Sequence, residues 1–220
     1  MTGEMLNLLV CSDPHSSEPA LDMLTQEASA DSYDAIIVCG DFTTFGTVEY
    51  TEKFLDRIKL RTYAVPGNCD IPETVSVLEK HNASIHNISA ELAGWRFFGF
   101  GGALPSANGM PFEVEEDIIE RSLRSVASTG AVMVTHCPAY GMNDLTRDGR
   151  HLGSKGILRV ANEFKPALAL SGHVHEARGR MLTKDTVFAN PGPAKNGFFA
   201  SVKLGESVDI QFHEVQIRRR

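Results

Sequence analysis

The sequence predicts an α/β fold, a four-layer α-β-β-α sandwich of two mixed sheets flanked by helices. Short apolar runs alternate with helix-period stretches in the first half of the chain, and β-rich runs dominate from residue 168 to residue 213. Five of the apolar runs are followed at once by polar residues that can bind metals. No internal repeat or low-complexity linker divides the chain, so residues 1–220 are predicted to form a single domain.

The first elements are buried strands and the helices between them. Short apolar runs predict strands at Leu6–Val10, Ile36–Val38, Tyr63–Val65, Val132–Val134 and Leu168–Leu170. Apolar residues at helical spacing predict helices at Ser17–Ala30, Thr47–Ile58, Pro72–Lys80 and Glu113–Val126, and a further helix capped by Ser154 that continues through Phe164.

Further strands are predicted in two regions. They are Ile85–Ile88, Ala90–Leu92 and Trp95–Phe100 in the middle of the chain, and Arg178–Leu182, Thr186–Ala189, Phe198–Val202 and Val208–Phe212 near its end. The stretch Cys137–Ser154 is predicted to be an irregular loop, and loops of that length are often functional. Arg218–Arg220 is predicted to be a solvated tail.

Composition excludes several classes of protein. The net charge of −7 argues against stable nucleic-acid binding or a membrane surface, which need clustered Lys and Arg. No apolar run approaches the roughly 20 residues that span a bilayer. No secretory signal is visible, and Cys11, Cys39, Cys69 and Cys137 lack pairing or zinc-finger spacing. A reducing cytoplasm is therefore the predicted compartment.

Seven residues at the ends of the five buried runs are candidate metal ligands. They are Asp13, His15, Asp41, Asn68, His136, His173 and His175. Open α/β sheets bind ligands beyond the carboxyl ends of their strands, so these groups should meet at one rim. The Asp13/His15 and His173/His175 pairs each skip one residue, which in an extended segment points both side chains the same way.

The residue types fit hydrolysis at phosphorus. Imidazole and carboxylate suit zinc, manganese or iron, and a bridging carboxylate can hold two ions. Two metals roughly 3.5–4 Å apart can share a hydroxide as nucleophile and clamp the oxygens of an in-line displacement.

The order of these motifs resembles the calcineurin-like metallophosphoesterase superfamily. Asp-x-His, Gly-Asp, Gly-Asn-x-Asp, Thr-His and Gly-His-x-His follow one another from Asp13 to His175, and Asn190–Pro193 resembles the closing segment. The resemblance implies the same sandwich and two divalent ions, with manganese expected and iron, zinc or nickel as alternatives. One ion would be held by Asp13, His15, Asp41 and His175, and the other by Asn68, His136 and His173, with Asp41 bridging. It also implies catalytic roles for Asp41 and Asn68.

The chain departs from the superfamily at one position. Cys69 stands where a histidine that assists the leaving group is usual, so the resemblance is closest to small bacterial and archaeal phosphodiesterases with Gly-Asn-Cys-Asp. General acid help contributes roughly 10²–10⁴-fold, so poor leaving groups should react slowly. Asn68, Cys69 and His151 are the predicted substrate-binding residues. Thr44 replaces the tyrosine ligand of purple acid phosphatases, so their redox-coloured iron centre is not expected.

The predicted function is a phosphodiesterase acting on small phosphodiesters, favoured over a phosphomonoesterase. The alternative is a catalytically weak protein-binding scaffold on the same fold, as in the retromer subunit of this superfamily. The presence of His15, His136 and His173 favours the enzyme. The natural substrate, the physiological metal and the oligomeric state are not predicted.

Overall fold

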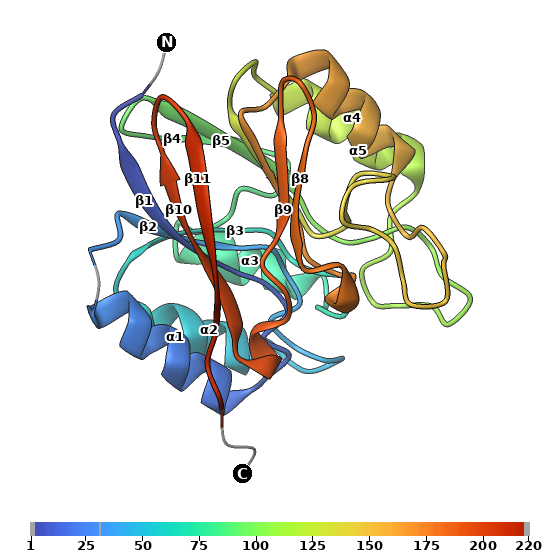
Figure 1. Cartoon of the computed structure of the whole chain (residues 1–220). Coiled ribbons are helices and arrows are strands. Elements are labelled where there is room, and N and C mark those ends of the chain that lie inside the picture. The colour runs from blue at the N-terminus through green and yellow to red at the C-terminus, as the bar shows by residue number, and fades with distance from the viewer. Residues whose placement is uncertain (1–2, 31, 218–220) are drawn as a thin grey trace.

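The computed structural model describes residues 3–30 and 32–217 (Figure 1). The Arg218–Arg220 run, predicted to be a tail, lies outside the described residues. Two mixed sheets face each other, and helices cover their outer faces. The predicted four-layer α-β-β-α sandwich is confirmed.

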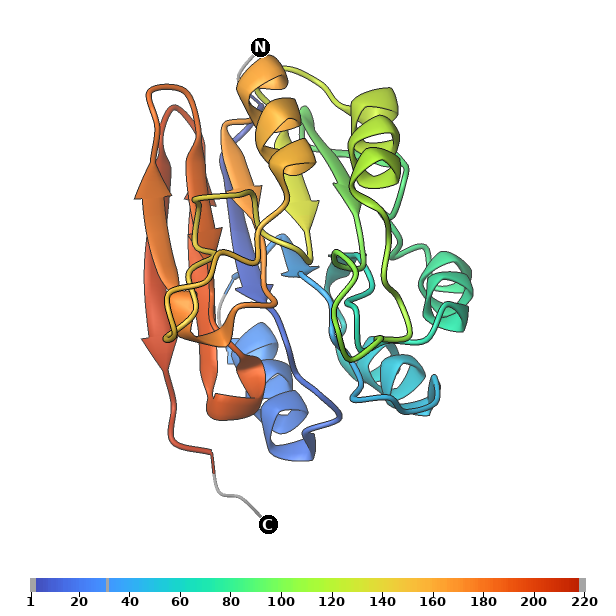
Figure 2. The same cartoon turned by 90° about the vertical axis from the view of Figure 1, so that its right-hand side faces the viewer.

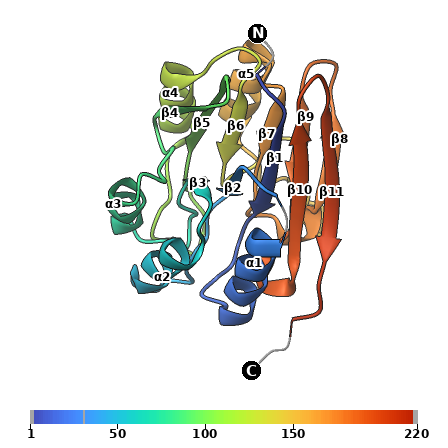
Figure 3. The same cartoon turned by 90° about the vertical axis from the view of Figure 1, so that its left-hand side faces the viewer.

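The first sheet has the strand order β11-β10-β1-β2-β3. Its strands are β1 (Leu6–Cys11), β2 (Ala35–Val38), β3 (Arg61–Ala64), β10 (Phe198–Leu204) and β11 (Val208–Glu214). The first three are parallel, whereas β10 and β11 run antiparallel to their neighbours. The connecting helices are α1 (Glu18–Ala30), α2 (Glu49–Arg57) and α3 (Glu73–Lys80), and they cover the outer face of this sheet (Figure 3).

The second sheet has the order β4-β5-β6-β7-β9-β8. Its strands are β4 (Ser89–Leu92), β5 (Trp95–Phe100), β6 (Val132–Thr135), β7 (Leu168–Leu170), β8 (Gly179–Leu182) and β9 (Val187–Asn190). The four inner strands are parallel, and the two edge strands are antiparallel. Helices α4 (Glu116–Val126) and α5 (Lys155–Phe164) cover it, and two short 3-10 helices follow β7 and β9, η1 (His175–Ala177) and η2 (Ala194–Asn196).

Strand β1 is buried on both faces, which explains its continuous apolar sequence. Leu8 and Val10 pack between the two sheets, whereas Leu9 lies on the face covered by the first three helices. The Tyr63 and Phe97 rings stack across the intersheet layer with centroids 4.9 Å apart. Full burial of one such side chain stabilises the fold by about 1.5–3 kcal/mol. The strand ends that carry the candidate ligands are thus anchored in a rigid core.

Two sequence predictions of secondary structure are wrong. Residues 85–88 do not form a strand, because the segment pairs first with one sheet and then with the other. Ser84 forms a bridge with Ala64 of β3, and His86 forms one with Gly99 of β5. Helix α4 begins at Glu116 rather than Glu113, because residues before it pair with the loop at Ala103.

No helix in residues 3–30 or 32–217 combines the length and apolar character that crossing a bilayer requires. The carboxyl ends of the parallel strands in both sheets point toward one rim of the sandwich, as the arrowheads of β1 (dark blue) and β6 (yellow) show in Figure 2. The loops leaving this rim carry the polar residues described next.

Candidate metal centre

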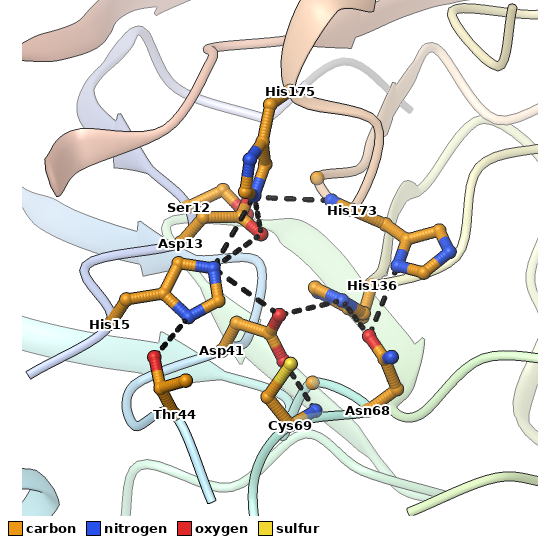
Figure 4. A network of polar contacts seen from close by, with 12 residues as sticks. Ser12, Asp13, His15, Asp41, Thr44, Asn68, Cys69, His136, His173 and His175 are labelled. Carbon is orange, nitrogen blue, oxygen red and sulfur yellow. Dashed lines mark hydrogen bonds and ion pairs between the residues drawn. The ribbon is translucent and has the colours of Figure 1, made fainter. Parts of the chain in front are cut away.

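All seven candidate ligands meet at this rim (Figure 4). They come from the loops that follow β1, β2, β3, β6 and β7, so five separate strand ends contribute to one site. The side chains form two groups with Asp41 between them.

The first group is formed by Asp13, His15 and His175, whose ligand atoms lie within 4.8 Å of one another. The Nε2 atoms of His15 and His175 are 3.3 Å apart. Asp13 Oδ1 is 3.2 Å from His175 Nε2 and 3.8 Å from His15 Nε2. Asp41 Oδ2 is 3.6 Å from His15 Nε2 and so faces this group.

The second group is formed by Asn68, His136 and His173. Asn68 Oδ1 is 2.8 Å from His136 Nε2 and 3.0 Å from His173 Nδ1. Asp41 Oδ2 lies 3.5 Å from His136 Nε2. The same carboxylate oxygen therefore faces both groups at almost equal distances.

Two histidines are oriented by hydrogen bonds to the main chain. His136 Nδ1 donates to the Cys39 carbonyl at 2.7 Å. His15 Nδ1 lies 3.3 Å from the Thr43 carbonyl and 2.9 Å from the Thr44 hydroxyl. With Nδ1 protonated, the Nε2 lone pair of each ring points into the site. Metal-binding histidines are usually held in this way, and the converging lone pairs need a proton or a cation between them.

Four of the ligand residues have left-handed backbone conformations. The φ angles are 53° at Asp13, 48° at His15, 56° at Asp41 and 67° at His173. The sequence prediction that the paired ligands lie on extended segments is therefore wrong, because sharp turns aim these side chains. Each such residue costs about 1–3 kcal/mol and persists only where its surroundings impose it, which is common at functional sites. The turn at residue 173 also separates the pair, since His173 joins one group and His175 the other.

The site concentrates negative charge away from water. Asp13, Asp41 and Asp70 are all buried. Burial alone would raise the pKa of Asp13, but a hydrogen bond with His175 and the charge of His136 lower it below its usual range. Burial opposes protonation of His136, yet the carboxylates of Asp41 and Asp13 raise its pKa. Buried carboxylates need a positive charge beside them, and carboxylate oxygens together with imidazole nitrogens suit divalent cations.

Asp70 is a supporting residue that the sequence interpretation did not single out. Its carboxylate accepts hydrogen bonds from the Gly67, Phe42 and Thr43 amides at 2.8, 3.1 and 2.8 Å, and so joins the loop after β2 to the loop after β3. Burial and the Asp41 charge raise its pKa to about 6. The sequence signal for this role was the place of Asp70 as the fourth residue of the Gly-Asn-Cys-Asp motif. Gly67 is also required, since a Cβ there would lie 2.0 Å from Asp41 Oδ1.

Asn190 supports the last ligand loop from β9. Its Nδ2 donates to the carbonyls of Gly172 and Val174 at 3.3 and 2.9 Å, on either side of His173. The Asn-Pro-Gly-Pro segment that begins with Asn190 is the sequence signal for this role.

Cys69 and His151 are both predicted to bind substrate, and each has its own neighbours in the structure. The Cys69 sulfur is within 4.8 Å of ligand atoms of His15 and Asp41. Partial burial and the Asp41 carboxylate raise the pKa of this thiol. His151 instead lines a cavity that also contacts Asn68 and His173. Substrate binding by Asn68, Cys69 and His151 stays a prediction.

The sequence of the chain matches the model of one known family. The model of the calcineurin-like phosphoesterases matches residues 6–177, which include all seven candidate ligands. The chain belongs to the calcineurin-like phosphoesterase family. As a member of this family, it is a metal-dependent phosphoesterase.

Similar proteins agree with the assignment to the calcineurin-like phosphoesterases. The chain is 31% identical over 173 residues to the uncharacterized protein MJ1162 of Methanocaldococcus jannaschii, covering 74% of this chain and 79% of that protein. The crystal structure of TT1561 from Thermus thermophilus has a TM-score of 0.75 at 18% identity and covers 96% of this chain and 100% of that one. A structure described as a novel archaeal phosphodiesterase has a TM-score of 0.56 at 17% identity, with coverages of 94% and 100%. At these identities, the two structures support the fold alone.

Proposed function

We propose that this calcineurin-like phosphoesterase hydrolyses small phosphodiesters with two bound divalent ions. The observation that carries the proposal is the position of Asp41 Oδ2, which is 3.6 Å from His15 Nε2 and 3.5 Å from His136 Nε2. A carboxylate oxygen between two sets of imidazole lone pairs is the arrangement expected of a dinuclear centre.

Each ion would have its own set of protein ligands. Asp13, His15, His175 and Asp41 would hold one, and Asn68, His136, His173 and Asp41 would hold the other. Bound divalent ions would activate water and neutralise the phosphoryl oxygens. The mixture of nitrogen and oxygen donors suits manganese, with iron, zinc and nickel as alternatives. Asp41 and Asn68 would be the catalytic residues, since both face the centre of the site.

The cavity beside Asn68 and His173 supports a diester rather than a monoester, because it offers room for a second organic substituent. The net charge of −7 supports a small substrate over stable binding to nucleic acid. The free thiols of all four cysteines support a reducing cytoplasm.

Metal removal and reconstitution test this function. Protein treated with EDTA should not cleave bis-p-nitrophenyl phosphate, and Mn²⁺ should restore turnover with two ions per chain by elemental analysis. The diester should be cleaved with a kcat/KM at least about tenfold above that of p-nitrophenyl phosphate, reflecting roughly 1.4 kcal/mol of discrimination. Preference for the monoester would contradict the diesterase assignment. Two bound ions without turnover of either substrate would favour the scaffold alternative.

A further inference from the structure

A cavity of about 480 Å³ opens directly beside two of the candidate metal ligands, Asn68 and His173. Its other walls come from residues 104–110 and 150–153, which belong to the loops drawn in green and yellow in Figure 1. The volume lies within the range typical of small-molecule sites, about 300–1,000 Å³. Leu104, Met110 and Leu152 supply apolar wall, so the cavity suits an organic group rather than a bare phosphate.

His151 lines the same cavity and is held by a buried carboxylate. Its Nδ1 is 2.8 Å from Asp144 Oδ1. Asp144 is itself fixed, because its Oδ2 accepts hydrogen bonds from the Gly141 and Gly153 amides at 2.9 and 3.2 Å. With Nδ1 bonded to Asp144, the Nε2 atom of His151 is the nitrogen left to interact with a ligand. The His151 side chain is 40% exposed, so a ligand can reach it.

An imidazole whose Nδ1–H is held by a buried carboxylate has a fixed orientation, which leaves its Nε2 atom to exchange a proton with a ligand. Cys69, where the resemblance to the family leads one to expect a histidine, lies beside His15 and Asp41, and its thiol is a weak hydrogen-bond donor. The chain does carry a carboxylate–histidine pair in the wall of the cavity that Asn68 and His173 also line.

We propose that this cavity holds the leaving group of a phosphodiester and that His151 protonates the leaving oxygen, with Asp144 as a positioning residue. The inference rests on the proposed diesterase function. In the step, a water oxygen forms a bond to phosphorus and the bond from phosphorus to the leaving oxygen breaks. The Nε2 proton of His151 moves to that oxygen, which departs as an alcohol. The water proton passes to solvent, and solvent then reprotonates His151.

Leaving-group dependence tests the role of His151. A diester that releases p-nitrophenolate needs little protonation, whereas one that releases an alkoxide needs much. His151→Gln should therefore lower kcat on an alkyl diester about 100-fold, within the range for general acid catalysis, and on bis-p-nitrophenyl phosphate by less than about fivefold. A plot of log kcat against leaving-group pKa should become steeper. His81→Gln, which changes a histidine on the C-terminal side of α3, should leave the slope unchanged.

Binding provides a readout independent of turnover. Ala107, an exposed residue of the cavity wall, can be enlarged without disturbing the core. Ala107→Trp should weaken binding of diphenylphosphinate, a monoanion with two organic groups and no cleavable ester bond, about tenfold by calorimetry and leave binding of inorganic phosphate unchanged. Metal content should equal that of the wild type in both Ala107→Trp and His151→Gln.

The outcomes separate this inference from the function on which it rests. A metal-loaded wild-type protein that cleaves neither diester would overturn the diesterase function. Wild-type turnover of both diesters, with His151→Gln equally slow on both or slow on neither, would overturn the role of His151 alone. Unchanged diphenylphosphinate binding in Ala107→Trp would overturn the assignment of the cavity to the leaving group.

Discussion

The two ligand groups contain similar donors, but one histidine in each group is held very differently from the other. In the group of Asn68, His136 and His173, the His136 side chain is 0% exposed and donates to the main chain at Cys39. In the group of Asp13, His15 and His175, the His175 side chain is 33% exposed and lies in the short helix η1. A buried, hydrogen-bonded imidazole is pre-organised, whereas an exposed one loses more freedom on binding.

This difference predicts that the two groups bind their ions with different affinities. We expect the ion near His136 to bind more tightly and exchange more slowly than the ion near His175. The cavity and His151 lie on the side of the tightly held group, so substrate is expected to approach along the rigid half of the site. We expect Asp41, which faces both groups, to couple the two halves.

Removing the shared charge should have the largest effect. Asp41→Asn should lower diester turnover by at least about 10³-fold while leaving the fold intact, because losing this charge would loosen both ions, which would otherwise activate the attacking water. Asp209→Asn, which alters an exposed carboxylate on β11, is the matched control. Steady-state kinetics and metal analysis would measure the effect. Near-normal turnover with two ions bound would mean that Asp41 is not the shared ligand.

Single histidine variants should then separate the two halves. His136→Ala and His173→Ala should weaken one ion, and His15→Ala and His175→Ala the other. We expect the loss to be about 100-fold or more for His136→Ala, since even supporting residues contribute 10–100-fold to metal affinity. The loss for His175→Ala should be smaller because that side chain is less constrained. Metal titration by calorimetry should give two classes of site. Equal loss of both ions in all four variants would contradict the division.

The sequence predicted which residues meet but not how they are aimed. Strand-end position and motif order were sufficient to place His136 and Asn68 at one rim, because parallel strands share their carboxyl edge. The left-handed turns at Asp13 and His173 were not predictable from spacing, since the surrounding fold imposes them. The pairing of His151 with Asp144 arises inside an irregular loop that has no periodicity to interpret. The segment at Ile85 was predicted to be a strand because it is apolar, yet it forms single bridges with one sheet and then with the other.

A supporting residue should affect both halves moderately. Asp70→Asn replaces an acceptor of several amide hydrogen bonds with a group that accepts through one oxygen only. It should lower the free energy of unfolding by about 1–3 kcal/mol, the cost of leaving buried donors unsatisfied. Urea denaturation of metal-free protein would measure this loss, with Asp209→Asn as the reference. An unchanged midpoint and slope would show that the two loops are held together by other contacts.

Cys69 should matter least, although it is the position at which the chain departs from its family. Its sulfur lies by His15 and Asp41, and a thiol is a weak hydrogen-bond donor. Cys69→Ala should therefore change turnover of bis-p-nitrophenyl phosphate by less than about threefold, well below a general acid contribution. Cys69→His should have little effect in the wild type but should restore about tenfold of the alkyl-diester turnover lost in His151→Gln, because it supplies a second imidazole. A large loss in Cys69→Ala with both ions retained would instead mean that the thiol takes part directly in the reaction. The group of Asp13, His15 and His175, beside which Cys69 lies, would then contribute to the chemistry as well as to metal binding.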